Sequence, residues 1–429
     1  MDDALRYRRS TLICCMFTVV LAGCGGASGT LPLSHSIASH SDGSGSYKVI
    51  YSFKGGMDGA LPESDLLDVN GKLYGTTLSG GGASNSRCAY GCGTVFETTT
   101  SGASRILHRF AGYPNDGAYP AAGLIEFKGK LYGTTSGGGA SITGTVFAMS
   151  SAGQEKLLYS FGAYGDGDGR YPTSDLLAFK DVLYGTTEYG GKSYCYASIT
   201  CGTVFKVTTS GKETVVYSFR NDRSQTDGFW PRAGLVASNG LLFGTTLGGS
   251  DSAGTIYTIT PAGKEAVLYG FSGRHDGASP FGRLTVLNGE FYGTTEGAGA
   301  YGFGTVFAIN AAGKERTVYE FKGSPTDGTS PEGDLAVVDG KLYGTTANGG
   351  KYRCFATRIG CGTVFAVTPS GSESVLHNFK GREDGADPVG GLADVNGSLY
   401  GATYSGGTGC GATRGANSGG CGTIFEVTP

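Results

Sequence analysis

The chain has 429 residues, including 79 Gly and 13 Pro, and its charged fraction of 16% is well below the roughly 25% of an ordinary globular protein. So much Gly excludes a helical bundle, and 39% apolar residues with 25 Tyr and 22 Phe can fill a core, which excludes a disordered chain. The net charge of −3, with no run of Lys or Arg after residue 9, excludes electrostatic binding to nucleic acid.

The first 46 residues predict export and anchoring. Three arginines between residues 6 and 9 precede an apolar run, Leu12 to Ala22, that is too short to span a bilayer and ends in small residues. The run leads into Leu21-Ala22-Gly23-Cys24, which resembles the bacterial lipobox. This resemblance implies that residues 1–23 are a lipoprotein signal peptide and that Cys24 carries the lipid.

The residues after Cys24 predict a tether and a location. Residues 24–46 are rich in Ser and Gly and are expected to be a flexible linker. Gly25 follows the Cys where some lipoproteins have Asp, which favours the outer membrane by their sorting pattern. We therefore expect a protein of the cell envelope, held to the membrane by the lipid at Cys24, and leave open whether it faces the periplasm or the cell surface.

A motif of the form Asp-Gly-x-x-Pro occurs seven times, at intervals of 49 to 59 residues. The copies begin at Asp58, Asp116, Asp168, Asp227, Asp276, Asp327 and Asp384. In every copy an aromatic residue followed by Gly stands twelve residues after the Pro, the first being Tyr74. Self-similarity at a period of this length is typical of a propeller or a solenoid.

Each repeat predicts four short strands, a to d. A Leu four residues after the Pro opens the apolar strand a, and a turn such as Asn70-Gly71 joins it to strand b. After a loop of variable length, Gly-Thr-Val-Phe or a close variant begins strand c, and a turn leads to strand d, whose aromatic residues alternate. Four antiparallel strands, seven times, indicate an all-β fold: a seven-bladed β-propeller over residues 47–429.

The two ends of the repeat region complement each other. Residues 47–53 form a strand d with no blade of its own, and the chain stops after a strand c at Pro429. We expect the N-terminal strand to complete the last blade, because this removes an open sheet edge and closes the ring.

The recurring pattern Tyr-Ser-Phe, Asp-Gly-x-x-Pro, Leu-Tyr-Gly-Thr-Thr and Gly-Thr-Val-Phe resembles the GloVer-type tandem repeat of bacterial "choice-of-anchor" proteins over residues 47–429. The resemblance implies that the anchor varies between members, here Cys24, and it implies no established activity and no catalytic residues.

Eight cysteines remain in the mature chain, in four pairs within the loops between strands b and c. The pairs are Cys88 and Cys92, Cys195 and Cys201, Cys354 and Cys361, and Cys410 and Cys421. Only the four long loops contain them, which predicts four local disulfides in an oxidising compartment. Because the spacings differ and no partner His follows, we expect no metal site there, and no cofactor.

The connections d→a and b→c lie on one face of such a propeller, called here the loop face, and every change of length falls on it. The seven motif aspartates are expected to accept backbone N–H bonds in turns. His108 and His377 stand where other repeats have Tyr in strand d, so we interpret them as repeat variants, and His275 is the one His in these loops. Catalytic residues are not identifiable.

Aromatic residues on the loop face are the candidate ligand-binding residues, since they suit stacking on sugars or on a protein. They are Tyr90, Tyr194, Tyr196, Trp230, Tyr301, Phe303, Tyr352, Phe355 and Tyr404. We predict a monomeric binding or scaffolding module for a glycan or an envelope protein. The alternative is a lyase- or cyclotransferase-like enzyme with its site at the central mouth, where Trp230, Arg283 and His275 break the repeat symmetry. A passive surface structure is a third possibility.

Overall fold

The computed structural model describes residues 46–82, 87–163, 165–196, 198–220, 227–249, 253–354, 360–410 and 420–429. They all belong to one unit, Asp42–Pro429. The predicted signal peptide, Cys24 and the predicted tether up to residue 45 lie outside the described residues, as does Phe355. Among the described residues there is no helix long and apolar enough to cross a membrane.

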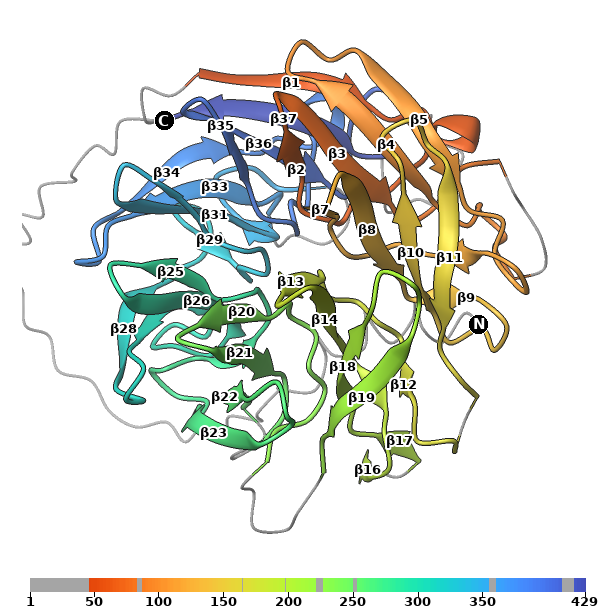
Figure 1. Cartoon of the computed structure of the whole chain (residues 1–429). Coiled ribbons are helices and arrows are strands. Elements are labelled where there is room, and N and C mark those ends of the chain that lie inside the picture. The colour runs from red at the N-terminus through yellow and green to blue at the C-terminus, as the bar shows by residue number, and fades with distance from the viewer. Residues whose placement is uncertain are drawn as a thin grey trace, which may run out of the picture. The chain divides into compact units, whose positions relative to one another are not determined.

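Seven antiparallel sheets, each with four blade strands, form a ring (Figure 1), which confirms the predicted seven-bladed propeller. The three-residue strands a line the centre: β2 (Leu67–Val69), β7 (Ile125–Phe127), β13 (Leu177–Phe179), β20 (Val236–Ser238), β25 (Thr285–Leu287), β30 (Ala336–Val338) and β35 (Ala393–Val395). Strands b follow outward: β3 (Lys72–Thr77), β8 (Lys130–Thr135), β14 (Val182–Thr187), β21 (Leu241–Thr246), β26 (Glu290–Gly297), β31 (Lys341–Thr346) and β36 (Ser398–Thr403).

The outer half of each blade consists of strands c and d. Strands c are β4 (Thr94–Thr99), β10 (Thr145–Met149), β18 (Thr203–Val207), β22 (Thr255–Ile259), β27 (Thr305–Ile309), β33 (Thr363–Val367) and β37 (Thr423–Thr428). Strands d are β5 (Ser104–Arg109), β11 (Glu155–Ser160), β19 (Glu213–Ser218), β23 (Glu265–Gly270), β28 (Glu315–Glu320), β34 (Glu373–Asn378) and β1 (Ser46–Ser52).

Short strands and helical turns lie in the connections of the loop face. Two-residue and three-residue strands pair as β6 (Gly117–Ala118) with β9 (Gly137–Gly138), β12 (Gly169–Arg170) with β15 (Tyr189–Gly190), β16 (Tyr194–Tyr196) with β17 (Ile199–Thr200), and β29 (Gly328–Thr329) with β32 (Asn348–Gly349). In the fifth blade β24 (Ala278–Pro280) pairs directly with β26. Within the described ranges, the helical turns are two 3₁₀ segments, η2 (Gly56–Asp58) and η4 (Arg382–Asp384).

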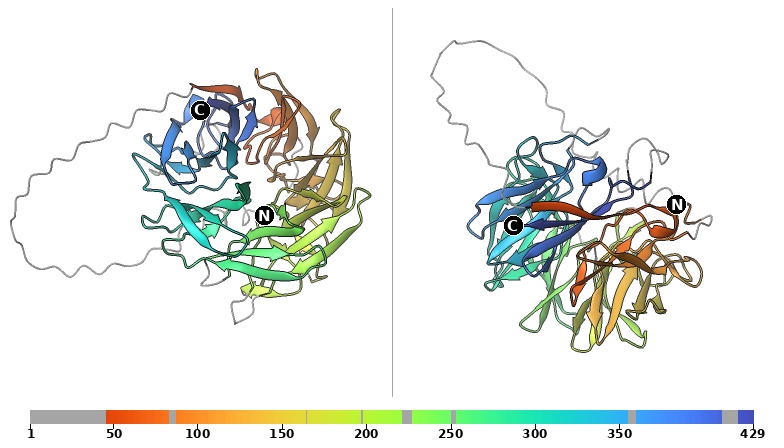
Figure 2. Two further views of the ribbon diagram at one scale, coloured as in Figure 1. Left: turned by 60° about the vertical axis from the view of Figure 1, so that its left-hand side comes forward. Right: turned by 90° about the horizontal axis from the view of Figure 1, so that it is seen from above.

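The ring is closed by the N-terminal strand, as the sequence predicted. Strand β1 pairs antiparallel with β37, with Tyr47 opposite Val427 and Tyr51 opposite Ile424. Both views in Figure 2 place the red N-terminal strand against the blue last blade. The last blade therefore has the order β1-β37-β36-β35 and no missing strand.

An aromatic pair joins each blade to the next. The Phe that follows each strand d is fully buried and packs edge-on against the aromatic residue in strand c of the next blade, with ring centroids 5.0 to 5.2 Å apart. Phe53 contacts Phe96 across the closure in the same way that Phe110 contacts Phe147. Such edge-to-face geometry is favoured by the ring quadrupole, so burial and orientation both stabilise every interface.

The Asp-Gly pair of each motif has a defined structural role, which confirms the turn interpretation. One carboxylate oxygen of each Asp accepts a backbone N–H at the end of strand d, at 2.7 to 3.0 Å. Gly follows because a Cβ on Gly59 would lie 2.7 to 2.8 Å from the hydroxyls of Thr77 and Thr94, which bond to each other at 2.8 Å. The motif therefore fixes the turn between blades.

Candidate functional site

The four predicted disulfides are present in the structure: Cys88–Cys92, Cys195–Cys201, Cys354–Cys361 and Cys410–Cys421. In each, the second cysteine lies directly before the Gly-Thr that opens strand c. The bridges therefore hold the long b→c loops close to the body of the blade.

The predicted aromatic residues divide into two groups. Tyr90 (61%), Tyr194 (61%), Tyr196 (69%) and Tyr301 (53%) are exposed, as is Phe303 (40%). Trp230, Tyr352 and Tyr404 are half-buried. Tyr352 packs against the hydrophobic core between the sixth and seventh blades, so part of its surface serves the fold.

Tyr194 and Tyr196 form a pair on one short strand, β16. Side chains alternate along a strand, so the buried Cys195 between them faces the blade while both tyrosines face solvent. Strand β16 pairs with β17 in a hairpin that the Cys195–Cys201 disulfide closes. We call Tyr194 and Tyr196 the tyrosine platform.

Trp230 supports this hairpin from the neighbouring blade. Its indole Nε1 donates to the carbonyl of Thr200 at 3.2 Å, and its backbone N–H donates to the carbonyl of Cys201 at 2.8 Å. Its ring lies edge-on to Phe229. Trp230 therefore positions the platform and presents little free ring surface of its own.

A groove of about 700 Å³ lies beside the platform, between the outer strands of the second and third blades. Its walls include Tyr159 of β11 and Glu213 and Tyr217 of β19. At the loop face it is bordered by Asp166, Asp168, Lys192, Ser193 and Arg220. Lys192 and Ser193 lead directly into β16, so the groove and the platform are continuous along the chain.

The charges in this groove nearly balance. The Tyr159 hydroxyl donates to Asp168 at 2.7 Å, and the same carboxylate oxygen accepts the Gly162 N–H. Burial, with the charge of Asp168 adding to it, raises the pKa of Glu213 to about 8, so this carboxyl is protonated at neutral pH. Asp166 and Asp168 then supply the negative charges of the lining and Lys192 and Arg220 the positive ones, so the groove presents hydroxyl, carboxyl and basic groups without a strong net charge.

The mouth of the central channel contains a second polar cluster, formed by the third residue after four of the motif prolines. Its members are Asp65, Asp175, Arg283 and Asp334. Each aspartate accepts the backbone N–H of the preceding blade, at 2.5 to 2.6 Å, and Arg283 Nε donates to Asp334 Oδ2 at 2.9 Å. These side chains thus join neighbouring blades around the channel.

Three carboxyl groups and one guanidinium group are buried together at the mouth of the central channel, and this shifts the pKa values of Asp65, Asp175 and Arg283. Burial first, then Asp334 and Asp175, raise the pKa of the Asp65 carboxyl well above its usual range, and burial also raises the pKa of Asp175. Asp334, followed by Asp175 and Asp65, raises the pKa of Arg283. The cluster favours taking up positive charge, as a proton or as a cation.

Carboxylate oxygens of Asp65, Asp175 and Asp334 lie within 4.8 Å of one another, so these three residues could hold a metal ion. The cavity there measures about 90 Å³, which admits a few waters or an ion but no sugar ring. The sequence interpretation recognised Arg283 as a break in symmetry but missed the aspartates. The signal was present, because this position is Asp, Gly or Arg in different repeats.

His275 does not join the mouth cluster. Its side chain is 81% exposed, and its Nδ1 lies 3.3 Å from Glu320 Oε1 in the next blade. Of the three symmetry-breaking residues, Arg283 alone is placed at the channel mouth, while Trp230 supports the tyrosine platform and His275 lies on the outer surface.

The chain is similar in structure to several solved proteins at low sequence identity. A mutant puromycin hydrolase is 12% identical, with a TM-score of 0.51, over 82% of this chain and 50% of the other. A gluconolactonase from Xanthomonas campestris is 12% identical, with a TM-score of 0.42, over 92% and 93% of the two chains. A putative 6-phosphogluconolactonase from Bacteroides uniformis is 16% identical, with a TM-score of 0.45, over 72% and 84%. At such identities the first likeness shows the fold alone.

The repeat itself identifies the family. No curated protein matches the sequence. The family model described as the Gloeobacter/Verrucomicrobia repeat matches residues 36–199, 85–290 and 247–429, which together span the whole propeller with its seven Asp-Gly-x-x-Pro motifs. The chain therefore belongs to the Gloeobacter/Verrucomicrobia repeat family.

Proposed function

We propose that this protein is a lipid-anchored propeller of the cell envelope that binds a glycan at the tyrosine platform and the adjoining groove. The observation that carries the proposal is the tyrosine platform: two aromatic side chains, 61% and 69% exposed, held on one disulfide-closed hairpin. Large exposed aromatics on a rigid element bind a ligand with little loss of conformational entropy.

The chemistry of the groove favours a neutral, polyhydroxylated ligand. Asp166, Asp168, Lys192 and Arg220 offer hydrogen-bond donors and acceptors in nearly balanced charge. A polyanion would meet the two aspartates, and a polycation would meet the two basic side chains. Sugar hydroxyls can bond to both kinds of group while a ring stacks on Tyr194 or Tyr196.

The envelope location rests on two supports. Four disulfides favour an oxidising compartment outside the cytoplasm. The lipobox-like Leu21-Ala22-Gly23-Cys24 supports lipid attachment at Cys24. A binding module on a tether would act on ligands near the membrane surface.

The test uses the purified protein and an array of neutral oligosaccharides, followed by calorimetry with any that bind. The double variant Tyr194→Ala, Tyr196→Ala should bind at least tenfold more weakly, the equivalent of about 1.4 kcal/mol. Tyr301→Ala is the matched control, since Tyr301 is similarly exposed but stands in the fifth blade, away from the groove. Equal affinity of the double variant and the parent would overturn the proposal. Binding of an envelope protein that oligosaccharides do not displace would assign this face to a protein ligand instead.

The channel mouth supports a second candidate, an enzyme that works on a substrate lying above the mouth. Buried carboxyls with raised pKa values, Asp65 and Asp175, beside the ion pair of Asp334 and Arg283, are suited to proton transfer. Incubation with polysaccharides, with new reducing or unsaturated ends as the readout, tests for hydrolase or lyase activity. Turnover that Asp175→Asn leaves unchanged would exclude this site.

A further inference from the structure

Every interface between blades contains the same three positions: the Tyr or His of strand d, the motif Asp, and, in strand d of the next blade, the residue four positions before its Tyr or His. Four interfaces combine Tyr, Asp and Glu in these positions, for example Tyr159, Asp168 and Glu213, or Tyr269, Asp276 and Glu315. The Tyr hydroxyl donates to the Asp in each case, and Tyr269 also bonds to Glu315 at 3.3 Å. These tyrosines satisfy the motif aspartates by hydrogen bonding, while one buried oxygen of Glu213, of Glu315 and of Glu373 has no hydrogen-bond partner among the described residues.

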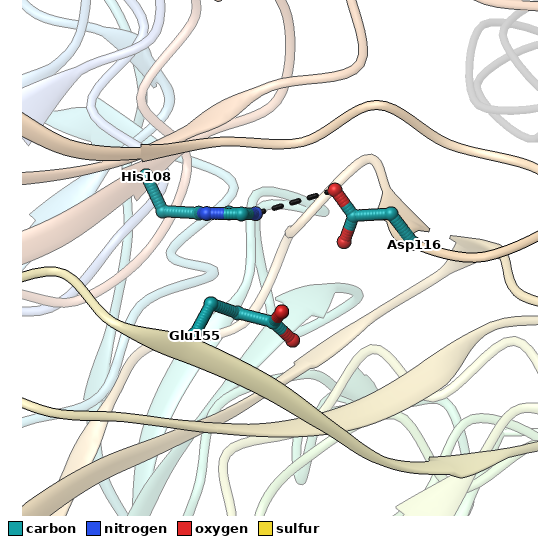
Figure 3. Close-up of side chains that lie close together, drawn as sticks. All are labelled: His108, Asp116 and Glu155. Carbon is teal, nitrogen blue, oxygen red and sulfur yellow. Dashed lines mark hydrogen bonds and ion pairs between the residues drawn. The ribbon is translucent and has the colours of Figure 1, made fainter.

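The interface between the first and second blades differs in the strand-d position, where His108 replaces Tyr. His108 Nε2 lies 3.3 Å from Asp116 Oδ2, and ligand atoms of His108, Asp116 and Glu155 all lie within 4.8 Å of one another. Figure 3 shows the imidazole facing Asp116, with the Glu155 carboxylate approaching from the next blade. The side chains of His108 and Asp116 are only 20% and 15% exposed.

We propose that His108, Asp116 and Glu155 bind a divalent transition-metal ion of the zinc class, which bridges the first two blades. One imidazole nitrogen and two carboxylate oxygens are a donor set that zinc accepts, with the fourth position left for water. Bonds of about 2.0–2.2 Å in a tetrahedron place ligand atoms roughly 3.4 Å apart, close to the 3.3 Å between His108 and Asp116.

The surroundings fit a ligand role for the carboxylates. Glu155 Oε1 is buried and has no hydrogen-bond partner among the described residues, so it can accept a metal. Asp116 accepts N–H bonds from Ala111 and Gly117, both at 2.7 Å, which orient its carboxylate. A divalent ion would also neutralise the repulsion between Asp116 and Glu155.

The other interfaces provide natural controls within the same chain. At the sixth interface His377 faces Asp384, but Tyr47 stands in the Glu position, stacks on the imidazole at 3.6 Å and bonds to the backbone of Asp384. At the second interface Tyr159 stands in the His position. Among the described residues, His, Asp and Glu meet at the first interface alone.

The test measures zinc binding by calorimetry on the purified full-length protein, without a polyhistidine tag and after removal of metals by chelator. The parent should bind one zinc at this site and melt at a higher temperature with zinc present. His108→Tyr restores the residue that most repeats have, so it should fold and melt like the metal-free parent while losing this zinc. It leaves the aspartates of the channel mouth intact, so a loss assigns the ion to this interface.

A gain-of-site variant keeps the proposal testable whatever the behaviour of His108→Tyr. Tyr159→His places the same three residue types at the second interface, with Asp168 and Glu213, and should add a second zinc. An absence of zinc binding by the parent, or an unchanged stoichiometry in His108→Tyr, would overturn the proposal. A melting temperature of the parent that zinc does not alter would also overturn it.

Discussion

Buried glutamates at the blade interfaces should make the propeller less stable as the pH rises from 5 to 8. Burial, followed by the charge of Asp327, raises the pKa of Glu373 from 4.5 to about 7. A carboxyl with a raised pKa in the folded state contributes stability that is fully present below pH 4.5 and is lost as the pH rises through 7. For Glu373 alone this loss is up to about 2.5 kcal/mol between pH 5 and 8, less any solvent screening.

Other groups act in the same direction. Burial raises the pKa values of Glu155 and Glu315 to about 7 and that of Glu213 to about 8, in each case with the motif Asp adding to it. The total change should therefore exceed that of Glu373. The assay is guanidinium unfolding at pH 5 and 8, followed by circular dichroism and by the fluorescence of the single tryptophan, Trp230.

Two variants separate this cause from general effects of pH. Glu373→Gln keeps the shape of the side chain but cannot ionise, so it should reduce the difference between the two pH values by about 2 kcal/mol. Glu97→Gln is the control, since the bonds from Arg105 lower the pKa of Glu97 to about 2 and it stays ionised throughout this range. Equal or greater stability of the parent at pH 8, or a Glu373→Gln variant with the full pH difference, would refute the reasoning.

Three further predictions concern closure, the disulfides and the anchor. Deletion of residues 47–53 should cost several kcal/mol, seen as a lower melting temperature, because it exposes β37 and the partners of Phe53; a variant that melts like the parent would contradict the closed ring. Peptide mapping without reduction should find Cys88 linked to Cys92 and no free thiol among the eight cysteines of the propeller; any other partner for Cys88 would refute local pairing. Cys24→Ala should release the protein from membranes or block its processing, and a variant that stays in the membrane fraction with normal mobility would show that Cys24 is not the anchor.

The fold could be predicted from the sequence because the same turn and strand motifs recur seven times at nearly constant spacing. The constant twelve residues between the motif Pro and the aromatic residue of strand b, such as Tyr74, fix the blade, and Tyr47 to Phe53 supply its missing strand. Turn residues and the alternation of apolar residues in strands depend on near neighbours in the chain, so a single sequence is enough to recognise them.

The candidate sites could be predicted only in part, because they depend on distances across the ring. Tyr194 and Tyr196 follow from alternation around Cys195, but Asp65, Asp175 and Asp334 are about 110 to 270 residues apart and meet only where strands a converge. From the sequence alone, His108 is interpreted as a repeat variant, because it stands where most repeats have Tyr. Its proximity to Glu155 depends on how two blades pack, which the pattern does not state.

Because β1 pairs with β37, the ring can close only after the last blade has been synthesised. Strand β1 emerges first, yet its partner β37 follows about 380 residues later, roughly 20 to 80 seconds at ordinary rates of translation. Through that interval an apolar strand with Val49 and Ile50 has no edge to pair with and could pair with another chain. Lys48 supplies a charge in this strand, and in the closed ring it reaches Glu426 at 2.6 Å. Before the last blade is made, the charge of Lys48 disfavours pairing of β1 with another chain. Once the last blade has formed, the same side chain makes an ion pair with Glu426 of β37.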